Sequence, residues 1–173
     1  MQPSINPRWV AAVVVGLILF VILSNPRNRL WHGPGAEPEI MSFEDDDKEM
    51  NSAMEEARKN VETFIVAVSS PKMAQSHHSV KVGFRDEHGN EYIWLNDVRY
   101  RDGVFIGTIG NIPQTVRSVH FGDPVTVSAE KIADWMYLES QKLIGGYTMR
   151  VMRDRLSDKE RQAFDAQIGF QIE

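Results

Sequence analysis

The sequence predicts an α+β domain that follows an N-terminal membrane-spanning segment. Three observations support this fold class. Residues Trp9–Leu23 form an uncharged apolar run. Apolar residues then recur at steps of three and four between Met50 and Val68, which is the spacing of an amphipathic helix. Between Val80 and Ile106 apolar and polar residues alternate, as in strands that bury one face.

Length and composition favour one domain with an appendage. The chain has 173 residues, of which 42% are hydrophobic and 25% charged, as in ordinary globular proteins. Residues 1–24 are predicted to be a membrane anchor, 25–42 a linker rich in proline and glycine, and 43–173 a soluble α+β domain.

Charge and cysteine content exclude several function classes. From Glu37 onward lie all 24 acidic residues but only 16 of the 19 Lys and Arg residues, so this part carries a formal charge of −8. An acidic domain of this kind is unsuited to nucleic-acid backbones, and no nucleic-acid partner is predicted. The absence of Cys excludes disulfides, thiolate catalysis and Cys-ligated zinc.

The run Trp9–Leu23 predicts contact with the lipid bilayer. Its fifteen residues would form a helix of about 22 Å, and Trp9 and Ser24 extend it toward the interfaces. A cleaved signal peptide and a buried core helix are the alternatives. Arg27 and Arg29 follow the run whereas Arg8 precedes it, which leans slightly toward a cytoplasmic domain.

The soluble part is predicted to begin with one long helix, Asp46–Ser69. The acidic run Glu44–Asp47 stands at its start, where carboxylates favour the helix dipole, and Ser70-Pro71 ends it. Phe64 is expected to be central in the core. The same acidic run lacks the central Gly of a calcium loop, so capping is the favoured interpretation.

An antiparallel sheet of about five strands is expected to pack against this helix. Val80, Val82 and Phe84 alternate with polar residues or Gly, and Asp102-Gly103 is a hairpin signal. In the second strand Tyr92, Trp94, Val98 and Tyr100 are predicted to share one face. Val125–Val127 and Ile132–Leu138 complete the sheet.

Short helices are predicted at the C-terminal end. Thr148–Arg155 is expected to be helical, with a final strand as the alternative. Ser157 and Glu160 have the spacing of a capping box, which opens a last helix through Phe164 to Ile168.

Several segments occur in an order that resembles the YegJ-like family of bacterial proteins, a family without an assigned function. The resemblance covers roughly residues 44–167. It rests on these segments: Met50–Phe64, Glu91–Trp94, Gly107–Pro113, Gly122–Val125, Ile132–Tyr137 and Gly146–Thr148. It implies a bacterial source and a compact α+β domain but no reaction and no catalytic residues. Together with the anchor it places the chain in the bacterial inner membrane.

No sequence motif indicates catalysis or a cofactor. Neither a Gly-x-Ser-x-Gly elbow nor a His-Glu-x-x-His helix occurs. His77-His78 is the strongest metal candidate, with Asp86, Glu87 and His88 nearby. Adjacent residues of a strand point to opposite faces, however, so no catalytic, metal or cofactor site is predicted.

Two segments carry candidate binding residues. Trp135 and Tyr137 are expected on one face of a strand and Met136 on the other. Trp, Tyr and Met are enriched at protein interfaces, so Trp135 and Tyr137 form a candidate partner-binding surface, with a packed strand as the alternative.

The second segment is a candidate anion site around Gly145–Arg153. Its residues are Gly145, Gly146, Tyr147, Thr148, Arg150 and Arg153. Glycines let a ligand approach the backbone, and a helix beginning near Thr148 would present free N–H groups beside two arginines. The alternative is a turn, with Thr148 capping its own helix and Arg150 paired with Asp154.

The favoured function is therefore a membrane-anchored, non-catalytic domain that binds an unknown protein partner. A small-ligand or anion-binding module around Gly145–Arg153 is the second hypothesis, and an enzyme of unidentified class is the third.

Overall fold

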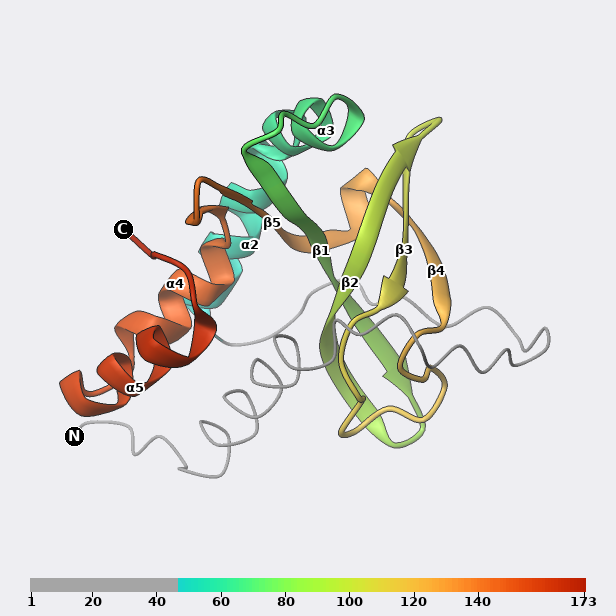
Figure 1. Cartoon of the computed structure of the whole chain (residues 1–173). Helices are drawn as coiled ribbons and strands as arrows, with labels where there is room; N and C mark the ends of the chain where they lie inside the picture. Colours follow the sequence, from blue (N-terminus) through green and yellow to red (C-terminus); the bar gives the residue numbers. More distant parts are fainter. Residues whose placement is uncertain (1–46) are drawn as a thin grey trace.

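The computed structural model describes residues 47–173. They form an α+β fold in which helices cover an antiparallel sheet (Figure 1). The sheet has six strands in the order β4-β3-β2-β1-β5-β6. The predicted fold class is confirmed for this part of the chain. The predicted anchor Trp9–Leu23 lies outside the described residues.

The elements of the described part follow one another along the chain with these bounds: α2 Lys48–Lys59, α3 Val61–Ser69, β1 Gln75–Asp86, β2 Gly89–Arg101, β3 Val104–Ile109, β4 Pro124–Ser128, the 3-10 turn η1 Ala129–Lys131, β5 Ile132–Glu139, β6 Lys142–Gly145, α4 Tyr147–Asp154 and α5 Asp158–Ile168. Within residues 47–173 there is no helix with the length and apolar character needed to cross a membrane.

The single predicted helix Asp46–Ser69 is wrong, because the chain forms two helices that meet at Asn60. The Asn60 side chain donates to the Glu56 carbonyl oxygen at 2.9 Å, and the Asn60 N–H donates to the same oxygen at 3.1 Å. Asn side chains compete for backbone groups in this way and interrupt helices. The apolar stripe nevertheless continues across the break, with Ala57 and Phe64 both fully buried.

The acidic start of α2 acts as a cap. Asp47 accepts from the Met50 N–H at 3.1 Å and forms an ion pair of 2.6 Å with Arg155 at the end of α4. The Arg155 guanidinium therefore holds the pKa of Asp47 at about 2. Arg155 also pairs with Glu49, so this end of α2 is tied to the end of α4.

β1 lies in the middle of the sheet and pairs with both β2 and β5. A bulge interrupts the pairing of β2 with β3 between Asn96 and Arg99, where Asp97 adopts a φ of +53°. The bulge shifts the side-chain alternation by one residue. Trp94 therefore faces one core cluster while Val98 and Tyr100 face the other, and the prediction that they share a face is wrong.

The number of strands is six, not about five, because β6 was not expected. This strand has four residues and ends in glycine. The other predicted strands and the hairpin at Asp102-Gly103 are confirmed. The capping box at Ser157 is confirmed too, with the Ser157 N–H donating to Glu160 at 3.0 Å and the Glu160 N–H donating to Ser157 Oγ at 3.4 Å.

A hydrophobic core lies on each face of the sheet. The larger core gathers α2, α3 and the inner face of β1 to β5 around Phe64, which is fully buried as predicted. The smaller core lies between the other face and α4 and α5, and contains Trp94, Met136, Met149 and Phe164. Because a core covers each face, β5 is buried along nearly its whole length.

A long loop between β3 and β4 is held to the sheet by two carboxylates. Glu91 Oε2 accepts from the N–H groups of Thr115 at 2.8 Å and Val116 at 3.3 Å. Asp86 Oδ2 accepts from the N–H groups of Arg117 at 2.6 Å and Ser118 at 2.9 Å. These bonds order a segment that contains no helix or strand.

Candidate functional site

A turn of two glycines leads from β6 into α4. Gly145 and Gly146 have φ values of +74° and +65°, in the left-handed region that favours glycine. A Cβ on Gly145 would lie 2.5 Å from Cε3 of Trp135. The Gly146 N–H donates to the Trp135 carbonyl at 2.8 Å. The turn therefore needs glycine both for its conformation and for its close approach to β5.

The first turn of α4 is capped by a carboxylate from β5. Asp134 Oδ2 accepts from the Thr148 N–H and from the Thr148 hydroxyl, both at 2.7 Å. Asp134 Oδ1 accepts from the N–H groups of Tyr147 at 3.2 Å and Trp135 at 2.8 Å. These bonds satisfy amides that a helix leaves without internal partners and place negative charge at the favourable end of the helix dipole.

Lys81 completes this arrangement from the neighbouring strand. It lies opposite Asp134 in the pairing of β1 with β5. Its Nζ donates to Thr148 Oγ1 at 3.1 Å and lies 5.7 Å from the centre of the Trp94 ring. Lys81 is 9% exposed, and Asp134 and Thr148 are fully buried. We call Lys81, Asp134 and Thr148 the buried polar cluster.

Burial dominates the electrostatics of this cluster. It lowers the pKa of Lys81, and the Asp134 charge opposes that effect. It raises the pKa of Asp134, which the bond from Thr148 and the charge of Lys81 oppose. Asp134 acts only as an acceptor in its four hydrogen bonds, which fits a carboxylate. The cluster is sealed and satisfied, and it fixes the position of α4 on the sheet.

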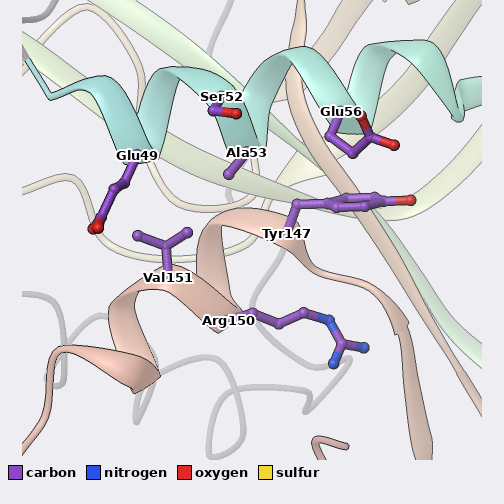
Figure 2. Close-up of a pocket in the computed structure, with 7 residues that line it drawn as sticks. All are labelled: Glu49, Ser52, Ala53, Glu56, Tyr147, Arg150 and Val151. Carbon is purple, nitrogen blue, oxygen red and sulfur yellow. The ribbon is translucent and has the colours of Figure 1, made fainter.

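On the outer side of α4 lies a groove of about 380 Å³ between this helix and α2. Figure 2 shows side chains from both helices directed toward one another across it. The lining residues are Glu49, Ser52, Ala53 and Glu56 of α2 with Tyr147, Arg150 and Val151 of α4. We call this hollow the α2–α4 groove.

Carboxylates line the α2 side of this groove. Glu49 is 74% exposed and pairs with Arg155 at 2.8 Å. Glu56 is 52% exposed, accepts from the Asn60 amide at 2.8 Å and lies 3.8 Å from Lys59 Nζ. Burial raises the pKa of Tyr147, and the charges of Glu56 and Asp134 raise it further against the opposing charge of Arg150. The effects of the two carboxylates on Tyr147 therefore outweigh the opposing effect of Arg150.

The structure brings together some of the residues of the predicted anion site. Tyr147 and Arg150 line the groove, and α4 begins at Tyr147 as a helix. The N–H groups of Tyr147 and Thr148, however, already donate to Asp134. The Asp134 carboxylate therefore occupies the position at this helix start that was predicted for an external anion. Binding of an external anion here stays a prediction.

The two arginines of that prediction have internal partners. Arg150 donates to the carbonyl oxygens of Gly145 and Leu143, both at 3.0 Å, and to that of Glu173. Arg153 does not reach the groove, because its guanidinium binds Asp165 of α5 with distances of 2.7 and 2.6 Å. The alternative pairing of Arg150 with Asp154 is not among these contacts.

The predicted partner-binding surface at Trp135 and Tyr137 is wrong, because these side chains are only 1% and 6% exposed. The Trp135 ring stacks on Phe64 with centroids 5.5 Å apart, and its Nε1–H donates to the Ala57 carbonyl at 2.7 Å. Trp135 and Tyr137 do share one face and Met136 faces the other, as predicted. The run Trp135–Leu138, apolar at every position, was the signal for a strand covered on both faces.

The histidine pair lies at a bulge in β1. His77 has a φ of +56°, and the ring of His78 stacks on Tyr137 with centroids 5.4 Å apart. Among residues 47–173 no three His, Asp or Glu side chains are grouped so that they could hold a metal ion.

Two residues of the site, Lys81 and Asp134, are not among the site residues predicted from the sequence. Lys81 occupies a polar position in an alternating strand, which indicates an outward side chain. Only the coverage of this second face by α4 and α5 buries it, and that packing is not visible in the local pattern. Asp134 inside an apolar run was the signal that a buried partner exists.

Comparison with known proteins agrees with the resemblance. Residues 47–172 match a family described as "Uncharacterized protein conserved in bacteria (DUF2314)". The chain is 38% identical over 104 residues to the uncharacterized protein YegJ of Escherichia coli (strain K12), covering 60% of this chain and 67% of the relative.

A second relative is a putative ankyrin repeat protein of Neisseria meningitidis serogroup B, 32% identical over 139 residues. This match covers 75% of the chain and 54% of the relative, so it spans about half of that protein. No solved structure matches the chain. Because the family match extends over most of its length, the chain belongs to the DUF2314 family of proteins conserved in bacteria.

Proposed function

We propose that the chain is a membrane-anchored, non-catalytic domain that binds a partner protein at the α2–α4 groove. The observation that carries this proposal is the groove itself. It is a hollow of about 380 Å³, lined from two helices by an aromatic ring and charged side chains. Concave sites with a few convergent polar groups are where proteins bind other molecules.

The buried polar cluster supports the groove without being a reaction centre. Its carboxylate and hydroxyl are fully buried and its polar atoms bind one another. A buried charged group whose partners are all internal contributes to a fixed geometry rather than to substrate turnover. In this proposal it holds Tyr147 and Arg150 at the wall of the groove.

The name of one relative agrees with a role in protein interaction. That relative is called a putative ankyrin repeat protein, and ankyrin arrays present extended binding surfaces. In the proposal Trp9–Leu23 anchors the chain in the bacterial inner membrane. Full-length protein should then stay with the membrane pellet after an alkaline carbonate wash. A soluble product beginning near Asn25 would instead indicate a cleaved signal.

Site-specific photocrosslinking in the native host tests the groove. A photoreactive amino acid is placed at Ser52, an exposed position in the groove, or at Thr126, an exposed position on β4. We expect a defined adduct with a protein from Ser52 and none from Thr126. The same adducts from both positions, or none from Ser52, would overturn the proposal.

A small organic ligand is the second candidate occupant. The groove volume lies near the lower end of the range for small-molecule sites, about 300–1,000 Å³. The mass of the Ser52 adduct separates the candidates, because a small ligand adds a few hundred daltons and a protein adds its whole mass.

A further inference from the structure

We infer that the α2–α4 groove receives an arginine side chain of the partner protein, with its guanidinium on the Tyr147 ring and beside Glu56. This inference rests on the proposed function and adds the chemistry of the contact. The proposed ligand group is a cation, whereas the second hypothesis from the sequence was an anion around Gly145–Arg153.

The first step concerns the donors that an anion would need. The N–H groups at the start of α4 bind Asp134, and three of the Arg150 N–H groups bind backbone carbonyls. An anion would have to compete with these internal acceptors. It would also lie beside Glu49 and Glu56, which repel it.

The second step concerns the acceptors that a cation would find. Glu56 is half exposed, and its carboxylate retains acceptor capacity after its bond to Asn60. Its contact with Lys59 joins two exposed side chains three residues apart, a kind of pair that is weak and readily exchanged. A guanidinium can form two parallel bonds with such a carboxylate.

The third step concerns the aromatic wall. In Figure 2 the Tyr147 ring lies between Glu56 on one side and Arg150 on the other. The charge of Glu56 beside this ring attracts a cation placed against it, and the charge of Arg150 on the other side opposes that attraction. Arginine combines a planar face for stacking on an aromatic ring with a fork of N–H donors for a carboxylate, and lysine offers only a point charge.

The fourth step concerns long-range attraction. From Glu37 onward the chain carries a formal charge of −8, which attracts a basic partner surface and repels an acidic one. The local charge of the groove and the overall charge of the domain therefore select the same sign of partner.

Peptide binding to full-length protein in detergent tests the inference. Two labelled peptides of the sequence Gly-Ser-Gly-X-Gly-Ser are compared by fluorescence anisotropy, with arginine or the uncharged analogue citrulline at X. We expect the arginine peptide to bind about fivefold more tightly. Glu56→Gln should remove this preference. Glu55→Gln changes the same charge at an exposed position outside the groove and should retain it.

Equal binding of the two peptides would overturn the inference, as would equal effects of the Glu55 and Glu56 substitutions. The proposed function has its own readout. If Ser52 still crosslinks a protein while the peptides do not differ, the groove binds its partner through other chemistry and only the inference fails. If Ser52 gives no adduct, the proposed function fails as well.

Discussion

Two segments of this fold are held to the sheet by carboxylates, and the carboxylates differ in their surroundings. Asp134 holds the first turn of α4 and is fully buried. Asp86 and Glu91 hold the loop between β3 and β4 at the turn end of the β1–β2 hairpin. All three accept backbone N–H groups, so hydrogen bonding alone does not distinguish them.

The difference appears in the pKa values. Desolvation raises the pKa of Asp86, but the N–H groups of Arg117, His88 and Ser118 outweigh it and set the pKa at about 2. Burial of Asp134 is strong enough to raise its pKa despite Thr148 and Lys81. In this pair the buried carboxylate has the raised pKa and the more accessible one has the lowered pKa, as the larger desolvation cost of a buried charge predicts. We call Asp134 the buried anchor of α4, and Asp86 and Glu91 the loop anchors. Substitution of the buried anchor is expected to have the larger effect on stability.

The largest effect is expected from Asp134→Ala. This substitution leaves Lys81 buried without its counter-charge and leaves the amides of α4 without an acceptor. We expect the free energy of unfolding of residues 43–173 to fall by about 3–5 kcal/mol, measured by urea denaturation. Asp154→Ala, at an exposed position near the end of α4, should change it by less than about 0.5 kcal/mol. Similar losses in both variants would contradict a special role for Asp134.

A double-mutant cycle sharpens the comparison next. Asp134→Asn and Lys81→Met should be less destabilising together than the sum of the single variants, because each single change leaves the other partner uncompensated. The coupling free energy is expected to be about 1–3 kcal/mol. Asp134→Asn combined with Lys131→Met, at an exposed position, should be additive. Additivity in both pairs would show that Lys81 and Asp134 act independently.

The half-buried carboxylate Glu91 should give a smaller and more local effect. Glu91→Gln weakens the bonds to Gln114, Thr115 and Val116 while the loop keeps its contacts with Asp86. The free energy of unfolding should change by less than about 1 kcal/mol. Amide hydrogen exchange at residues 114–116 should accelerate, while exchange at Arg117 and Ser118 stays unchanged. Faster exchange throughout α4 would contradict the separation of the two anchors.

The smallest effect is the pH dependence of Asp86. Its folded pKa of about 2 lies below the ordinary value of 3.8, so ionised Asp86 stabilises the fold above about pH 4. This contribution is lost as the pH falls through 2. Carboxyl ¹³C NMR should give a midpoint near 2 for Asp86, identified with Asp86→Asn, and a midpoint above 3.8 for Asp134. The reverse order of midpoints would contradict the comparison.

Local sequence signals predicted much of the fold. The capping box at Ser157, the hairpin at Asp102-Gly103 and the buried stripe around Phe64 each depend on short-range chemistry. The break at Asn60 and the bulge at Asp97 depend on single polar residues whose side chains or backbone override the periodic pattern. The first feature divides the predicted helix into two, and the second moves Val98 and Tyr100 to the opposite face of the strand from Trp94.

The candidate site was less predictable because it depends on tertiary packing. Tyr147 and Arg150 were proposed from the glycine turn, and they do lie together in the groove. The opposite wall comes from α2, about a hundred residues earlier, and no local pattern indicates that contact. Trp135 was assigned to the wrong environment for the same reason, since the helices that bury it are distant in sequence.

Photocrosslinking from Ser52 in variants of Asp134 and Glu91 tests the central claim most directly. That claim is that the buried anchor positions α4 so that the α2–α4 groove can bind a partner. Asp134→Asn and Glu91→Gln are each combined with the photoreactive group at Ser52, at a temperature where circular dichroism shows both folded. We predict that the adduct is lost with Asp134→Asn and retained with Glu91→Gln. Equal adduct yields in the two variants would contradict the claim.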